Sequence, residues 1–157
     1  NTGIISGKYS GGICASNVAQ NEGNVVISYC SNTTSTTRMG SQAGGICGYA
    51  AGNSSGIVEI KYCYNSQPIG LAGGGICGSQ CVGITIFNCY NTGNGDSSDE
   101  KQGGICGKFS SGIKVYNCWS SGSDLADAFI GSAYSTCTVK NCYNISDSTP
   151  IPNRFLG

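Results

Sequence analysis

The sequence predicts an all-β protein, a parallel β-solenoid (β-helix) of about five disulfide-braced coils. Three observations predict it. The string Gly-Gly-Ile-Cys recurs along the chain, each copy is followed by an alternating run that ends in a cysteine, and the 157 residues include 11 cysteines. Recurrence of this kind is typical of repeat proteins, in which each unit buries its apolar face against the next. We treat 1–157 as a single solenoid domain.

The glycine string marks the start of each predicted repeat. It occurs at 11–14, 44–47, 74–77 and 103–106, and a degenerate copy, Phe129-Ile130-Gly131, has glycine in place of the cysteine. Glycine lets the backbone turn a corner without a clash from a Cβ atom. The predicted repeats are about 11–43, 44–73, 74–102, 103–128 and 129–157, after a partial repeat at 1–10.

The second half of each repeat has the period of a half-buried β-strand. Five runs end in a cysteine, and these end cysteines are 33, 26, 29 and 24 residues apart. Apolar residues stand five and three residues before each end cysteine, and mostly polar or aromatic ones stand between them. The inward columns are Val25, Val58, Ile84, Ile113 and Cys137, and Ile27, Ile60, Ile86, Val115 and Val139.

Stacking such units in parallel turns each column into a continuous core, with rungs about 4.8 Å apart. A β-propeller or β-sandwich is the alternative, although propeller blades are longer and have four strands. A helical turn is expected only at 124–130.

Cysteine usage indicates an oxidising compartment, either extracellular or at a cell surface. Pairs along a column and pairs across a coil, such as Cys14 with Cys30 or Cys106 with Cys118, both stay open, and the odd count leaves at least one cysteine free or paired with another molecule. The segment Cys77-Gly78-Ser79-Gln80-Cys81 has no second half, so we expect no zinc site. The structural disulfide candidates are Cys14, Cys30, Cys47, Cys63, Cys77, Cys81, Cys89, Cys106, Cys118, Cys137 and Cys142.

Charge and length exclude several function classes. Only 10% of residues are charged and the formal net charge is zero, whereas nucleic acids and anionic membranes attract basic surfaces. The sequence has no apolar run of about 18 residues, so we expect no membrane insertion. There is no histidine and no nucleophile with a base at motif spacing, so we expect no enzyme activity and no cofactor.

The repeat unit resembles a known family of repeats. Gly-Gly-Ile-Cys-Gly, followed by Ile-x-Ile-x-Asn-Cys-Tyr-Asn-Thr-Gly at 84–93, is similar to the GLUG-type glycine-rich repeats of bacterial and protist surface proteins. The similarity covers nearly the whole chain. It implies a β-solenoid stalk or adhesin module at a cell surface, without catalytic residues. Cysteine within the glycine motif departs from the commoner leucine or valine of the family.

Several positions are candidates for binding or modification. Tyr64, Tyr90, Trp119 and Tyr143 share the column just after the end cysteine; they form either an exposed strip that stacks on glycans or another subunit, or a packed corner. Asn88, Asn117 and Asn141 precede the end cysteine, share their column with Tyr29 and Tyr62, and suggest a structural asparagine ladder. N-glycosylation sequons begin at Asn32, Asn53 and Asn144.

The sequence therefore predicts an extracellular structural or adhesive protein. The chain begins part-way through a repeat and ends on 154–157, which resembles the opening of another. Open ends favour head-to-tail stacking of copies into a filament, or a surface stalk. Glycan binding is the alternative. Ice binding is less favoured because Glu59 and Lys114 interrupt the threonine column, and the acidic residues Asp96, Asp99 and Glu100 do not have calcium-site spacing.

Overall fold

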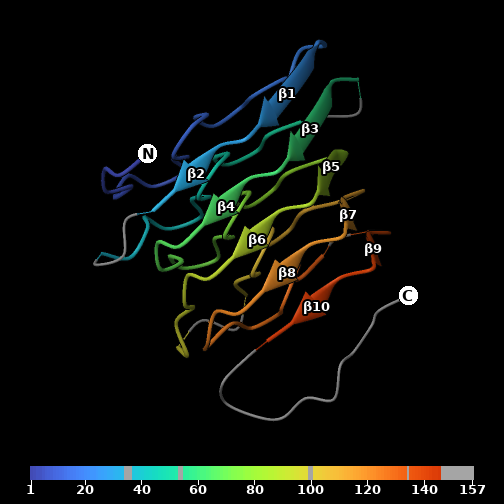
Figure 1. Cartoon of the computed structure of the whole chain (residues 1–157). Helices are drawn as coiled ribbons and strands as arrows, with labels where there is room; N and C mark the ends of the chain where they lie inside the picture. Colours follow the sequence, from blue (N-terminus) through green and yellow to red (C-terminus); the bar gives the residue numbers. More distant parts are fainter. Residues whose placement is uncertain (34–36, 53–54, 99–100, 134, 146–157) are drawn as a thin grey trace.

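The computed structural model describes residues 1–33, 37–52, 55–98, 101–133 and 135–145. Asn53, Asp99, Glu100 and the expected repeat opening at 154–157 lie outside these ranges. All regular structure in the described residues is β-strand, and 124–130, where a helical turn was expected, consists of bends and two isolated β-bridges. The strands form two stacks that lie side by side and run along a common axis (Figure 1).

The first sheet consists of the alternating runs. Its strands are β1 (Asn24–Ser28), β3 (Ile57–Lys61), β5 (Ile84–Phe87), β7 (Lys114–Tyr116) and β9 (Thr138–Lys140), hydrogen-bonded in that order. All pairs are parallel and in register, so Ile27 lies beside Ile60, and Ile60 beside Ile86. This register is the one that the sequence predicts, because a shift of one residue would turn the apolar columns to solvent.

The second sheet follows the first after a corner. It consists of β2 (Ser31–Asn32), β4 (Tyr64–Asn65), β6 (Tyr90–Asn91), β8 (Trp119–Ser120) and β10 (Tyr143–Asn144), also parallel and in register. One residue before each end cysteine turns the corner in the left-handed conformation, with φ between 52° and 55°. Asparagine tolerates this conformation well, and it occupies the corner in the last three repeats.

A third ladder carries the glycine strings. Gly44 pairs with Gly74 and Gly74 with Gly103, while Cys47 pairs with Cys77 and Cys77 with Cys106, all in parallel. A Cβ atom on Gly74 would overlap the carbonyl oxygen of Cys77 and the backbone of the next rung. The turn therefore requires glycine at the first position of the string.

The core lies between these three ladders. Its largest fully buried side chains include Ile46, Ile76 and Ile105 from the glycine strings and Ile60 and Ile86 from the first sheet. The chain is thus all-β, with parallel strands wound into a β-solenoid.

The last repeat departs from the predicted alignment. Asp127 pairs with Gly103 and Ile130 with Cys106, and the Gly131 amide donates to the Cys106 carbonyl. Ile130, and not Gly131, therefore takes the place of the cysteine, so the predicted alignment was wrong by one residue. Asp127 replaces the first glycine because its Oδ1 accepts hydrogen bonds from the amides of Phe129 and Ile130, at 2.9 and 3.2 Å.

Candidate functional site

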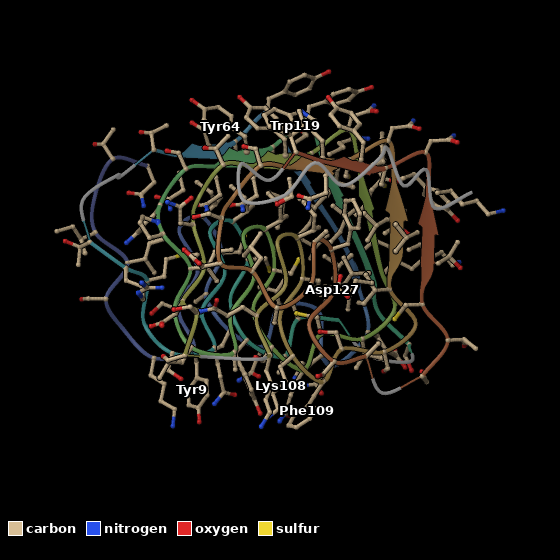
Figure 2. All side chains as sticks on the ribbon, turned by 90° about the horizontal axis from the view of Figure 1, so that it is seen from below. Tyr9, Tyr64, Lys108, Phe109, Trp119 and Asp127 are labelled. Carbon is tan, nitrogen blue, oxygen red and sulfur yellow. The ribbon has the colours of Figure 1, made fainter. Side chains whose placement is uncertain are left out.

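The predicted aromatic column forms a continuous stack on the outside of the second sheet. Tyr64 and Tyr90 have ring centroids 4.8 Å apart and planes within 1°, and Tyr90 and Trp119 have centroids 4.6 Å apart and planes within 2°. Tyr143 continues the stack at 6.1 Å and 10°. Figure 2 shows Tyr64 and Trp119 on the face opposite Tyr9, Lys108 and Phe109.

The rings of this stack point their edges, and not their faces, outward. The centroid spacing is close to the rung spacing of about 4.8 Å, and the planes are parallel, so the ring faces lie along the solenoid axis. Tyr90 therefore has an aromatic ring on each face. Beside Tyr64 the next rung carries Ser31, which leaves that face of Tyr64 without a ring from the column. Each stacked pair contributes about 0.5–1.5 kcal/mol beyond its buried area.

The side chains around the stack carry no charge. We define the uncharged face as the aromatic column and the columns on either side of it. The first sheet, in contrast, has charged side chains: Glu59 and Lys61 form an ion pair at 2.6 Å, and Lys114 and Lys140 follow on β7 and β9. The columns of the uncharged face are Ser31, Tyr64, Tyr90, Trp119 and Tyr143; Tyr29, Tyr62, Asn88, Asn117 and Asn141; and Thr33, Ser66, Thr92, Ser121 and Ile145.

A buried asparagine ladder lies beneath the aromatic stack. Asn32 Nδ2 donates to Asn65 Oδ1, and Asn65 Nδ2 donates to Asn91 Oδ1, each at 2.8 Å. Each of the last two side chains also closes a local turn, since Asn65 Nδ2 donates to Gln67 O and Asn91 Nδ2 to Gly93 O. All three asparagines are fully buried.

This ladder, together with the backbone of the next rung, leaves no room for a side chain at the second glycine of three glycine strings. A Cβ atom on Gly45 would overlap Asn65, one on Gly75 would overlap Asn91, and one on Gly104 would overlap Ser120. The sequence pointed to a different asparagine column. Asn88, Asn117 and Asn141 are only half-buried or exposed, and their role in the fold is the left-handed corner.

The ladder also bears on the N-glycosylation candidates. Asn32 is 0% exposed and its Nδ2 makes hydrogen bonds to Asn65 and Gln67, so a glycan on this nitrogen is incompatible with the fold and that prediction was wrong. Asn144 is half-buried, and its sequon extends to Ser146, outside the described residues. The Asn53 sequon lies largely outside them as well.

All eleven cysteines are free thiols in the structure. Most of them form two columns inside the core: Cys14, Cys47, Cys77 and Cys106 in the glycine ladder, and Cys30, Cys63, Cys89, Cys118 and Cys142 at the end of the first sheet. In the second column, the amides of Cys63, Cys89 and Cys118 each donate to the sulfur of the next cysteine, at 3.4 Å. Burial raises the pKa of the Cys47 thiol to about 12, which keeps it protonated and unreactive at neutral pH.

The remaining candidate features are local. Asp96 Oδ1 accepts hydrogen bonds from the Ser98 amide and hydroxyl, and its other oxygen lies 3.7 Å from Arg38. Glu59, Thr85, Lys114 and Thr138 share one column in register, so charges interrupt the threonines as predicted. In the described ranges, no three acidic, cysteine or histidine side chains are placed to hold a metal ion, and no helix there is long and apolar enough to cross a bilayer.

Comparisons with protein-family models, with curated proteins and with solved structures found no match to this chain.

Proposed function

We propose that the chain is a structural module of an extracellular protein, a stiff rod that serves as a filament subunit or a surface stalk, like the GLUG-type repeats that it resembles. The proposed rod has five coils, one for each pair of strands, and oxidation of some of its cysteines braces it. Support comes from the ladders, each of which continues in register over three rungs: Tyr64 to Trp119, Asn32 to Asn91, and Ile27 to Ile86.

The observation that carries the filament version is the outer edge of β1. On its inner side, Gly23 O accepts from the Ile57 amide and the Tyr29 amide donates to Lys61 O. Alternate residues of a parallel strand bond to the same neighbour, so Asn24, Val26 and Ser28 direct their amides and carbonyls away from β3. No strand in the described ranges pairs with that side. Such an edge is a template for another strand.

A proline substitution tests this edge directly. Val26→Pro removes an outward-facing amide but no hydrogen bond of the β1–β3 ladder, and an edge strand accommodates the proline ring. Val26 is 59% exposed, so little packing is lost. Val26→Ala is the matched control, because it shortens the side chain and keeps the amide.

We expect the wild-type chain and Val26→Ala to form linear assemblies that lengthen with concentration, by sedimentation velocity and negative-stain microscopy. Val26→Pro should stay monomeric while keeping its far-UV circular dichroism spectrum. A strictly monomeric wild-type chain would exclude the filament version and leave the stalk.

Glycan binding is a second candidate because the uncharged face suits a neutral partner. Tyrosine, asparagine, serine and threonine provide hydrogen-bonding groups there. Since the rings present their edges, a sugar would meet mostly ring edges and polar groups, with little stacking on ring faces.

Glycan-array screening tests this candidate with Trp119→Ala and, as a control, Tyr116→Ala, which removes an aromatic ring from β7 on the first sheet. Binding that Trp119→Ala weakens and Tyr116→Ala preserves would support it. Binding that is absent, or equal in all three proteins, would exclude it.

A further inference from the structure

Two cysteines stand outside the two cysteine columns, and one of them lies against the thiols of a column. Cys137 belongs to the apolar column of Ile113, since the Thr138 amide donates to Ile113 O. Cys81 belongs to a different column, four residues after Cys77. There it takes the place that Ala51 has in the preceding repeat and Ser110 in the following one.

The turn around Cys81 directs its sulfur toward two other sulfurs. Cys81 Sγ lies 3.3 Å from Gly78 O, as Ser110 Oγ lies 3.0 Å from Gly107 O in the following repeat. In that repeat, Cys106 Sγ donates to Ser110 Oγ at 3.3 Å. The Cys81 amide donates to the same Ser110 Oγ at 3.2 Å, so Ser110 joins Cys81 to Cys106. Cys77 stands to Cys81 as Cys106 stands to Ser110 in the repeat, so the same turn directs the Cys81 sulfur toward Cys77. All three cysteines are fully buried.

Column geometry opposes bridges between successive cysteines of one column. Residues paired in register on parallel strands have parallel Cα–Cβ bonds, so their Cβ atoms are about 4.8 Å apart, like the strands. A disulfide requires Cβ atoms about 3.8 Å apart. Although the Cα spacing alone satisfies a disulfide, the Cβ spacing within a column does not. Cys81 escapes this restriction because it approaches Cys77 and Cys106 from another position in the turn.

We propose that the cluster of Cys77, Cys81 and Cys106 is a specific disulfide site, in which Cys81 is the obligatory partner and bonds to Cys77 or Cys106, while the column cysteines do not pair with one another. This inference rests on the proposed function, in which disulfides brace the solenoid, and it requires an oxidising compartment.

The bond forms by exchange with a small-molecule disulfide. The Cys81 thiolate attacks one sulfur of the small disulfide, which releases one small thiolate and leaves a mixed disulfide on Cys81. The thiolate of Cys77 or Cys106 then attacks the Cys81 sulfur and releases the second small thiolate. The two protons lost by the protein thiols end on the two released thiols. The protein pair is oxidised by two electrons and the small disulfide is reduced.

Exchange has to occur while the chain folds. In the folded chain, hydrogen bonds that the Cys77 thiol donates to Cys106 and Cys81, together with burial, raise the pKa of this thiol well above its usual value. A protonated, fully buried thiol reacts slowly.

Refolding the reduced full chain with oxidised and reduced glutathione tests the site. After refolding, the chain is denatured without reductant and alkylated with iodoacetamide, and its mass is measured. We expect nine of the eleven cysteines to be alkylated, and peptide mapping to join the Cys81 peptide to that of Cys77 or Cys106.

Neighbouring repeats supply matched variants. Cys81→Ala and Cys81→Ser introduce the residue types that the neighbouring repeats have at this position, at Ala51 and Ser110. We expect every remaining cysteine to be alkylated in both variants. Cys89→Ala, in the other column, should keep the bond. Full alkylation of the wild-type chain, a bond that persists in Cys81→Ala, or a bond between two column cysteines would overturn the inference. The assay needs no assembly, so its outcome is independent of the filament test.

Discussion

Ser120 interrupts the buried asparagine ladder, and Ser120→Asn should repair it. Ser120 Oγ and its register partner Asn144 Oδ1 are both buried without a hydrogen-bond partner. An asparagine at 120 would place Oδ1 where Asn91 Nδ2 can donate to it, and Nδ2 where it can donate to Asn144 Oδ1. The facing residue, Gly104, has no side chain and so leaves room for the larger asparagine, as Gly75 does for Asn91.

The magnitude follows from the bonds gained. Each new hydrogen bond has a net value of about 1 kcal/mol, and satisfying a buried acceptor such as Asn144 Oδ1 removes a penalty of about 1–3 kcal/mol. Ordering the asparagine side chain costs up to about 1 kcal/mol. We therefore expect Ser120→Asn to raise the free energy of unfolding by about 2 kcal/mol. For a chain of this length that corresponds to a rise in Tm of about 4–8 °C.

Urea unfolding followed by circular dichroism measures this difference, with Ser120→Ala as the control. Alanine removes the unpaired hydroxyl without building the ladder, so its free energy of unfolding should be within about 1 kcal/mol of wild type. If Ser120→Asn were no more stable than Ser120→Ala, hydrogen bonds along the ladder would not stabilise the fold.

Two further predictions concern the glycine string and the buried thiols. Gly75→Ala should lower the free energy of unfolding by about 3 kcal/mol or more in urea unfolding, because its Cβ atom overlaps Asn91 and Gly104 O. Gly112→Ala is the comparison: its φ is 62°, but a Cβ atom there would meet only Gly83, at 3.7 Å or more, so it should cost only about 1–2 kcal/mol. Because the pKa of Cys47 is raised to about 12 by burial, its contribution to stability is complete below the ordinary thiol pKa of about 8.5 and is lost as pH rises from there toward 12. At pH 8.5, iodoacetamide should therefore label Cys47 in the folded chain at least about 100-fold more slowly than in the unfolded chain, as measured by peptide mapping; equal rates would contradict this.

The arrangement of the strands could be predicted because each run repeats with period two and ends at the same residue type. Because Ile27 and Ile60 must both face the core, register shifts by an odd number of residues are excluded, and the alignment of the end cysteines selects the observed register. The alignment of the last repeat could not be predicted in this way. Sequence similarity placed Gly131 in the cysteine column, but the carboxylate of Asp127 replaces a glycine turn with hydrogen bonds to the backbone, and that substitution has no counterpart in the other repeats.

The asparagine ladder left a signal that the sequence interpretation passed over. Asparagine recurs two residues after the end cysteine at Asn32, Asn65, Asn91 and Asn144. Parallel stacking in register places these asparagines in one column, where their side-chain amides can bond to one another. The edge-on packing of Tyr64, Tyr90 and Trp119 left no such signal, because composition does not determine how a ring is oriented.

The column that passes through the glycine strings shows what its cysteines do. Ile130 occupies the next rung after Cys106, is 7% exposed, and continues the ladder, since the Gly131 amide still donates to Cys106 O. Isoleucine cannot form a bridge to Cys106, so what this rung of the column requires is a compact apolar side chain. The column cysteines thus act as core residues, which agrees with the Cβ spacing that opposes their pairing. Thiol chemistry is then needed only where a cysteine replaces a residue that the neighbouring repeats fill with alanine or serine, and that position is Cys81.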